Sequence, residues 1–145
     1  MTQNIERTVL FADLRGSTAM YETLGNADAT AVITQSVSLL AQIVAVHGGT
    51  VVKTLGDGLM AMFPSPPSGI AAADEMHDAL GRIGASADPL TTRLPVVPLK
   101  LQVGLAHGEV VEMSGDYFGD AVNVAARLLD HAGDNETLAT ADVLG

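Results

Sequence analysis

The stretch from Val51 to Phe63 constrains the fold most, because two short apolar runs flank the tight sequence Gly56-Asp57-Gly58. An Asp-Gly pair between hydrophobic segments is a strong signal for a β-hairpin, since glycine supplies the positive φ that the turn needs. The sequence therefore predicts paired strands over Val51–Leu55 and Leu59–Phe63.

This hairpin carries two charges that its folding does not require. Lys53 stands among Val, Thr and Leu before the turn, and Asp57 stands on the turn itself. A purely structural hairpin would be served as well by Asn-Gly. Taken alone, the stretch also fits an ordinary turn with a solvated aspartate and a lysine whose stem covers apolar surface. The rest of the chain decides between the two interpretations.

A second carboxylate ends an apolar run near the N-terminus. Thr8–Leu14 is typical of a buried central strand, and Asp13 lies at its end. Gly16 then turns the chain, and Ser17 or Thr18 can cap the helix that follows. A helix that begins directly after a strand presents free backbone N–H groups, which suit phosphate oxygens, although many such turns bind nothing.

The remaining segments predict an α+β fold. The order of elements is strand, helix, strand, strand, helix, strand, helix, strand. The first six match a ferredoxin-like βαββαβ core, a mixed sheet with helices on one face, to which a C-terminal helix and strand are added. After the first strand we expect helix 28–47, the hairpin, helix 68–83, a loop over 85–98, strand 99–111, a turn or short strand over 113–119, helix 120–129 and strand 137–140.

Within strand 99–111, two glycines interrupt the apolar alternation. Gly104 and Gly108 predict a bulge or a close approach of another backbone.

Length and composition limit the functions open to this fold. The 145 residues, 48% of them hydrophobic, predict a single domain over residues 1–145. The 17 acidic and 7 basic residues give a formal net charge of -10, which argues against bulk attraction to nucleic acid or an anionic membrane. The absence of cysteine excludes disulfides, thiolate metal sites and a cysteine nucleophile.

The N-terminus has no signal-peptide pattern, and no uninterrupted apolar run approaches the roughly 18 residues that a membrane-spanning helix needs. We therefore expect a cytoplasmic protein.

Asp13 and Asp57 are expected to meet, because a ferredoxin-like sheet makes the hairpin a neighbour of the first strand. Two carboxylates at adjacent strand ends can hold Mg²⁺, which prefers oxygen ligands and is often completed by substrate phosphates. Two such ions about 3.5–4 Å apart form the clamp used for in-line displacement at phosphorus. Metal ions would also supply the attraction for a triphosphate that a chain of net charge -10 lacks.

Three segments together resemble the signature motifs of class III adenylyl and guanylyl cyclase catalytic domains. They occur in order and cover nearly the whole chain, which makes the match far more specific than a lone glycine-rich loop. The segments are Phe11-Ala12-Asp13-Leu14-Arg15-Gly16-Ser17-Thr18, Lys53-Thr54-Leu55-Gly56-Asp57-Gly58-Leu59-Met60-Ala61 and Asp116-Tyr117-Phe118-Gly119-Asp120-Ala121-Val122-Asn123-Val124-Ala125-Ala126-Arg127.

The resemblance implies roles for the residues that match near the metal site. Asp13 and Asp57 would bind two Mg²⁺ or Mn²⁺ ions, with the backbone carbonyl of Leu14 as a further ligand. The substrate phosphates would lie against the turn formed by Gly16, Ser17 and Thr18.

Lys53 and Asp116 match the family's pair that selects the base, and their chemistry favours adenine. Lysine can only donate, which suits N1 of adenine, whereas an ionised aspartate can only accept, which suits the N6 amine. Guanine presents a donor at N1 and an acceptor at O6, so both contacts would be left unpaired at a large cost. We therefore expect ATP rather than GTP as the substrate.

Asn123 and Arg127 share one face of their predicted helix and match the family's transition-state pair. By this resemblance, Asn123 would orient the ribose, and Arg127 would stabilise charge on the phosphate as the 3′-hydroxyl attacks. The implied reaction converts ATP to 3′,5′-cyclic AMP and pyrophosphate, with no general base identified. Family members are head-to-tail dimers, so a chain that carries both sets of residues is expected to form a homodimer with two shared sites.

One departure and several alternatives stay open. The family's domain continues past Thr140 into a hairpin whose lysine contacts the triphosphate, whereas this sequence ends at Gly145, either by truncation or because it is naturally short. The main alternatives are a catalytically weak or inactive nucleotide-binding regulatory domain and a guanylate cyclase. A diguanylate cyclase or a polymerase palm is a remoter one, since the Gly-Gly-Asp/Glu-Glu-Phe run is missing.

Overall fold

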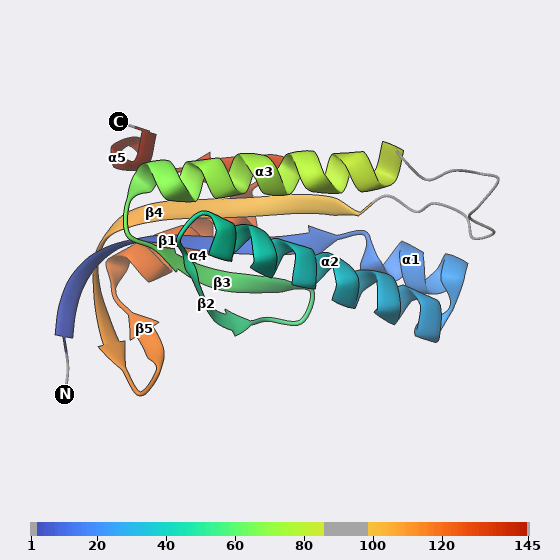
Figure 1. The fold of residues 1–145 in the computed structure, drawn as a ribbon, viewed down its shortest axis with the longest axis horizontal. Coiled ribbons are helices and arrows are strands. Elements are labelled where there is room, and N and C mark those ends of the chain that lie inside the picture. The colour runs from blue at the N-terminus through green and yellow to red at the C-terminus, as the bar shows by residue number, and fades with distance from the viewer. Residues whose placement is uncertain (1–2, 86–98, 145) are drawn as a thin grey trace.

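The computed structural model describes residues 3–85 and 99–144, so residues 86–98 of the predicted loop lie outside the described residues. Helices pack around one curved sheet (Figure 1). In chain order the elements are β1 (Gln3–Arg15), α1 (Ser17–Leu24), α2 (Asn26–Val46), β2 (Thr50–Thr54), β3 (Gly58–Phe63), α3 (Pro66–Ala85), β4 (Lys100–Met113), β5 (Asp116–Phe118), α4 (Asp120–His131), β6 (Glu136–Ala139) and α5 (Ala141–Leu144).

The sheet has the strand order of a ferredoxin-like core. β2, β3, β1 and β4 lie side by side in that order, and each neighbouring pair is antiparallel. β5 and β6 pair with the other edge of β4, the first antiparallel and the second parallel, so the sheet is mixed. The predicted fold class, with its added C-terminal helix and strand, is confirmed.

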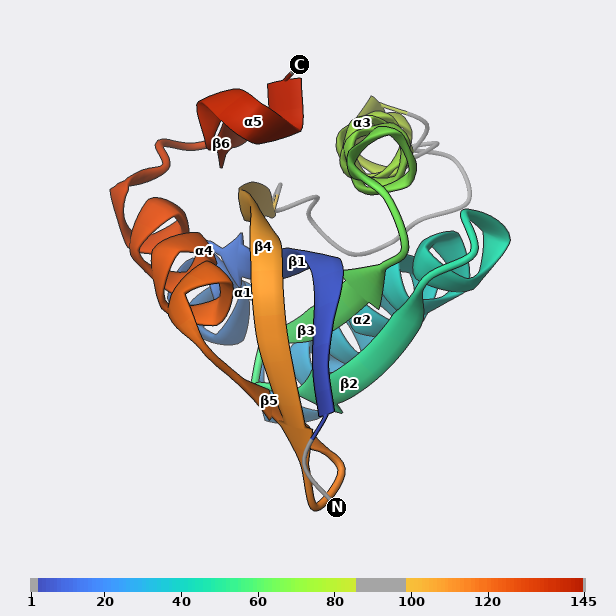
Figure 2. The same ribbon diagram turned by 90° about the vertical axis from the view of Figure 1, so that its left-hand side faces the viewer.

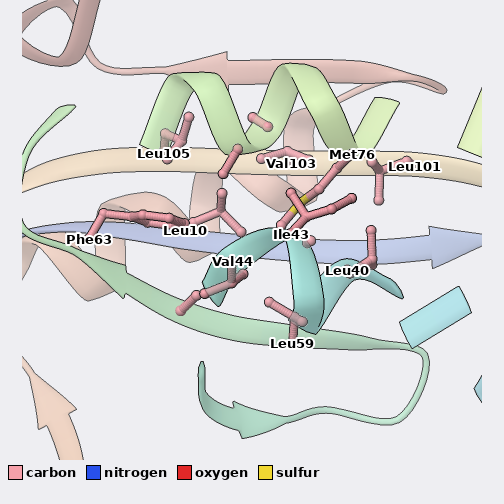
Figure 3. Packing of buried hydrophobic residues seen from close by; sticks show 14 of the residues in the cluster. Leu10, Leu40, Ile43, Val44, Leu59, Phe63, Met76, Leu101, Val103 and Leu105 are labelled. Atoms are coloured by element: carbon pink, nitrogen blue, oxygen red, sulfur yellow. The ribbon is translucent and has the colours of Figure 1, made fainter. Parts of the chain in front are cut away.

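Two hydrophobic clusters cover the two faces of the sheet. The larger cluster lies between the sheet and helices α2 and α3, and it brings together Leu10 of β1, Leu40 of α2 and Met76 of α3 (Figure 3). The smaller cluster lies on the opposite face, where α4 contributes Ala121 and Ala125 (Figure 2). The predicted core, with α2 and α3 on one face, is therefore confirmed, and the added helix α4 covers the other face.

α2 is long and apolar enough, by length and composition, to cross a membrane. Its buried side chains recur along one side, however, and pack against the sheet and α1, as those of a core helix do. Among them are Ile33, Leu40, Ile43 and Val44.

Candidate active site

The hairpin turn holds Asp57 in a two-residue loop. The Leu55 N–H donates to the Gly58 carbonyl at 2.9 Å, and the Gly58 N–H donates to the Leu55 carbonyl at 3.1 Å. The positive φ of 59° belongs to Gly56, which fits the hairpin turn that takes glycine at its first central position. The expectation that the glycine after Asp57 supplies this angle is therefore wrong.

Gly58 instead allows β3 to approach the end of β1. A Cβ atom at this position would lie 2.1 Å from the carbonyl oxygen of Ala12. Gly58 pairs with Asp13, and the Leu14 N–H donates to the carbonyl oxygen of Asp57 at 3.0 Å. The turn therefore sets Asp57 beside the strand end that carries Asp13.

A cavity of about 420 Å³ opens where this turn meets β1 and α1. The side chain of Leu14 belongs to the main core and is only 2% exposed, so this residue can offer the cavity little more than its backbone. The lining residues are Asp13, Leu14, Arg15, Gly16, Ser17, Thr18, Gly56 and Asp57.

α1 begins at this cavity without a side-chain cap. Its N-cap is Gly16, with a φ of 97°, and no side chain makes a capping hydrogen bond. The expectation that Ser17 or Thr18 caps the helix is therefore wrong. The N–H groups of the first turn have no partner within the helix, and such groups suit an anion.

Asp13 lies in surroundings that disfavour its charge. Burial raises the pKa of Asp13 above its ordinary value, Arg15 opposes this shift, and the carboxylates of Asp57 and Asp130 add to it. The Arg15 Nε lies 3.2 Å from the Asp13 Oδ2. Asp13 and Asp57 both line the cavity, so the two carboxylates lie at one site.

These donors fit a hard divalent cation. The two carboxylates and the backbone carbonyl of Leu14 offer only oxygen, and Mg²⁺ commonly keeps several waters and substrate phosphates instead of a complete protein cage. Within residues 3–85 and 99–144, no three His, Cys, Asp or Glu side chains form a ready metal cluster. Water and phosphate oxygens would therefore complete the coordination shell.

A β-bulge in β2 decides which face of the sheet Lys53 occupies. The register of β2 and β3 shifts between Val51 and Lys53, which leaves Val52 unpaired. Val51 packs against the α2 and α3 cluster, whereas Val52 packs against the α4 cluster, and Lys53 pairs with Met60 of that second cluster. Strict alternation would place Lys53 on the face of Val51, so the bulge redirects it.

Lys53 and Asp116 meet within one chain. The Lys53 Nζ donates to the Asp116 Oδ2 at 2.9 Å across 63 residues of sequence. This contact joins β2 to β5, which lie near each other in both views (Figures 1 and 2). The hydrogen bonds from Lys53 and from the backbone N–H of Tyr117 hold the pKa of Asp116 below its ordinary value. The carboxylate therefore stays ionised and acts only as an acceptor.

Asn123 and Arg127 are exposed and lie one turn apart on α4. The helix is held close to β4 at Gly104, where a Cβ would lie 2.3 Å from the carbonyl oxygen of Ala125. β1 and β4 pair without a shift in register, so Gly104 marks a close approach and not a bulge. Gly108 leaves room for a small side chain, since a Cβ there would lie 3.4 Å from the nearest atom.

The predicted site residues thus fall into two groups in one chain. The first group lines the cavity and comprises Asp13, Leu14, Gly16, Ser17, Thr18 and Asp57. The second group does not line that cavity in the part of the chain that the structure describes. It comprises Lys53, Asp116, Asn123 and Arg127.

Sequence reasoning gave no role to Arg15, which lines the cavity, or to Gln102, which contacts Arg15. The Arg15 Nε donates to the Gln102 Oε1, although 87 residues separate the two. Gln102 pairs with Asp13 across β1 and β4 and is only 9% exposed. A glutamine within the apolar run from Leu101 to Leu105 was the available signal.

The sequence model of the adenylate and guanylate cyclase catalytic domain matches residues 1–144. The chain belongs to this family. An uncharacterised protein of Mycobacterium tuberculosis is 34% identical over 133 residues, which cover 92% of this chain and 32% of the relative. An adenylate cyclase of the same organism is 33% identical over 134 residues, which cover 85% of this chain and 29% of the relative. The chain spans about a third of the length of these curated relatives.

Solved structures agree with the family assignment. An adenylate/guanylate cyclase/hydrolase from Silicibacter pomeroyi superposes with a TM-score of 0.78 at 26% identity, covering 99% of this chain and 80% of that one. An adenylyl cyclase from P. aeruginosa superposes with a TM-score of 0.84 and the same coverage. At 21% identity, this second likeness concerns the fold alone.

Proposed function

We propose that this chain is an adenylate cyclase, which converts ATP to 3′,5′-cyclic AMP and pyrophosphate at sites shared between two copies of the chain. Family membership supports a cyclase as the general class of enzyme. The finer assignment is supported mainly by the contact between Lys53 and Asp116, which brings a donor and an acceptor to one place. The adenylate cyclase name of a 33% identical relative agrees with it.

Adenine fits this pair, and guanine does not. The ammonium of Lys53 can donate to N1 of adenine, and the ionised Asp116 can accept from the N6 amine. Guanine would set its N1–H against the lysine and its O6 against the carboxylate. A site built to hydrogen-bond one base edge rejects the other strongly, because buried polar groups are left unpaired.

Asp13, Asp57 and the carbonyl of Leu14 would hold two Mg²⁺ or Mn²⁺ ions. When bound, such ions neutralise charge on the triphosphate and favour in-line displacement at phosphorus. The uncapped N–H groups at the start of α1, beside Gly16, would receive phosphate oxygens.

Arg127 and Asn123 complete the chemistry from the exposed face of α4. Arg127 would stabilise the charge that develops on the phosphate, and Asn123 would hold the ribose so that its 3′-hydroxyl faces the α-phosphorus. In one chain these residues do not line the cavity of Asp13 and Asp57. A homodimer that sets the α4 face of one copy over the cavity of the other supplies a complete site, and twofold symmetry then gives two.

The proposal is tested by incubating the purified chain with ATP or GTP and Mg²⁺ or Mn²⁺, and separating the products by chromatography. We expect cyclic AMP from ATP and far less cyclic GMP from GTP. Asp57→Ala should remove most activity, roughly a thousandfold, since metal ions contribute several kcal/mol to such reactions. Asp78→Ala, which removes an exposed aspartate on α3, is the matched control.

Other results would select another function. Preferential formation of cyclic GMP would make the chain a guanylate cyclase. Binding of ATP without any cyclic product would make it a regulatory nucleotide-binding domain.

A further inference from the structure

Arg15 is the only cation among the described residues that line the cavity of Asp13 and Asp57. The chain as a whole carries a net charge of -10, so attraction for a polyphosphate has to come from local groups. A guanidinium is well suited to this task, because its planar fork matches phosphate oxygens in two parallel hydrogen bonds.

The guanidinium of Arg15 is fixed along one edge. Its Nε lies 3.2 Å from the Asp13 Oδ2 and donates to the Gln102 Oε1. Gln102 is buried, and its Nε2 donates to the carbonyl oxygen of Ala132 at the end of α4. The Gln102 amide therefore makes hydrogen bonds through both its oxygen and its nitrogen, and it holds Arg15 in the lining of the cavity.

The other edge of the guanidinium remains open to a ligand. Arginine has five N–H donors, and the contacts of Arg15 with Asp13 and Gln102 both use Nε. Neither terminal nitrogen has a hydrogen-bond partner within the described part of the chain, and the side chain is 47% exposed. Four donors are thus available beside the uncapped start of α1.

We infer that Arg15 binds the pyrophosphate portion of the substrate and that Gln102 is its positioning residue. This inference rests on the proposed function. In that reaction the 3′-oxygen bonds to the α-phosphorus, and its proton passes to solvent. The bond from the α-phosphorus to the oxygen bridging to the β-phosphate breaks, and pyrophosphate leaves with that oxygen and the bonding electrons. Arg15 stabilises the charge that grows on this leaving group.

The first test measures binding and not turnover. Inorganic pyrophosphate is titrated by calorimetry into the chain in saturating Mg²⁺, with the wild type, Arg15→Ala and Arg15→Lys. We expect Arg15→Ala to weaken pyrophosphate binding at least roughly tenfold, as the loss of charge-assisted hydrogen bonds predicts. Arg15→Lys keeps the charge but loses the planar guanidinium, so its affinity for pyrophosphate should lie between those of the wild type and Arg15→Ala. Arg7→Ala removes an arginine from the N-terminal half of β1, away from the cavity, and should bind as the wild type does.

A second titration separates this role from simple neutralisation of Asp13. If Arg15 served only to balance the carboxylate, Arg15→Ala would tighten binding of Mn²⁺ alone and leave pyrophosphate affinity unchanged in saturating metal. That pair of results would overturn the inference.

Gln102→Leu tests the positioning role. It should weaken pyrophosphate binding in the wild-type background and have no further effect when combined with Arg15→Ala, because residues that act through one another are not additive. Equal effects in both backgrounds would assign Gln102 a merely structural role.

The two proposals fail in different ways. If the wild type makes no cyclic AMP but Arg15→Ala still weakens pyrophosphate binding, the assignment of Arg15 stands and the cyclase activity falls. If the wild type is active and Arg15→Ala binds pyrophosphate normally, the cyclase activity stands and the assignment of Arg15 falls. A wild type that neither turns over ATP nor binds pyrophosphate contradicts both.

Discussion

At the scale of single residues, Asp13 is held where its charge costs stability in the metal-free chain. Burial is the main cause, and Asp57 and Asp130 add repulsion that Arg15 offsets only in part. A structural aspartate would gain nothing from such surroundings. A metal ligand does gain from them, because a bound divalent ion is the largest local charge in its site and makes the charged form of the aspartate the favoured one.

Asp13→Asn should therefore stabilise the metal-free chain at neutral pH. The pKa of Asp13 is raised in the folded state, so the stability linked to its protonation is complete below the ordinary pKa and is lost as the pH rises through the raised one. Thermal unfolding in a chelator should show a higher melting temperature for the variant at pH 7 and no such gain at pH 3. A gain equal at both pH values would refute the electrostatic cause.

The proposed role of Lys53 and Asp116 in reading the base makes a prediction about specificity. Lys53→Glu combined with Asp116→Ser offers an acceptor to the guanine N1–H and a donor to O6. The ratio of kcat/KM for ATP to that for GTP should fall at least about a hundredfold, given the size of such hydrogen-bond discrimination. Steady-state kinetics with both nucleotides measures this ratio. An unchanged ATP preference would mean that these residues do not read the base.

Motifs in the sequence were enough to single out four charged groups of the candidate site, but not Arg15 or the contacts among these residues. Asp13, Asp57, Lys53 and Asp116 lie in segments with a recognisable pattern. The contact of Arg15 with Gln102 depends instead on the register between β1 and β4, which sets Gln102 opposite Asp13. Periodicity does not specify that register.

At the scale of elements, close packing fixes where α4 presents its exposed residues. The backbone of α4 lies so close to Gly104 that no Cβ atom would fit there. At Gly108, on the same strand, a Cβ atom would make only an ordinary van der Waals contact. Both positions look alike in the sequence, because a glycine in a strand predicts either a bulge or a close approach. Only the helix that packs above them distinguishes the two.

Gly104→Ala should accordingly destabilise the fold by about 3 kcal/mol, near the upper end of the usual cost of overpacking. Its Cβ would meet backbone atoms, the Ala125 carbonyl oxygen and the Leu129 nitrogen, which cannot rotate away. Gly108→Ala, the control on the same strand, should change stability by no more than about 0.5 kcal/mol. Urea denaturation compares the two, and equal losses would show that α4 does not pack as closely as described.

The bulge at Val52 shows a second limit of sequence patterns. Val51 and Val52 are both apolar, so either can face a core, and alternation offers no sign of the shift. The hairpin and its strands were predictable because Gly56-Asp57-Gly58 is a strong local signal. The face on which Lys53 lies was not, because it depends on one unpaired residue.

At the scale of the whole molecule, the predicted site residues fall into two groups, of which one lines the cavity and the other does not. The fold class and strand order followed from the order of elements, since a βαββαβ sequence admits few arrangements. The placement of α4 on the opposite face did not follow, yet this placement keeps Asn123 and Arg127 exposed and outside the cavity of Asp57. Such a division is expected of an enzyme whose sites lie between copies.

Complementation between inactive variants tests this division most directly. Asp57→Ala and Arg127→Ala are each expected to be inactive, because each spoils both sites of its own homodimer. Heterodimers contain one site with both defects and one intact site. After mixing in equal amounts and subunit exchange, half of the dimers are heterodimers, so cyclic AMP formation should recover to about a quarter of the wild-type rate.

The matched control mixes Asp57→Ala with Asp13→Ala, which damage the same half of the site and should stay inactive together. Recovery in the first mixture and none in the control is the result that the proposed homodimer predicts. A first mixture as inactive as the control, with heterodimers shown to be present, would contradict it.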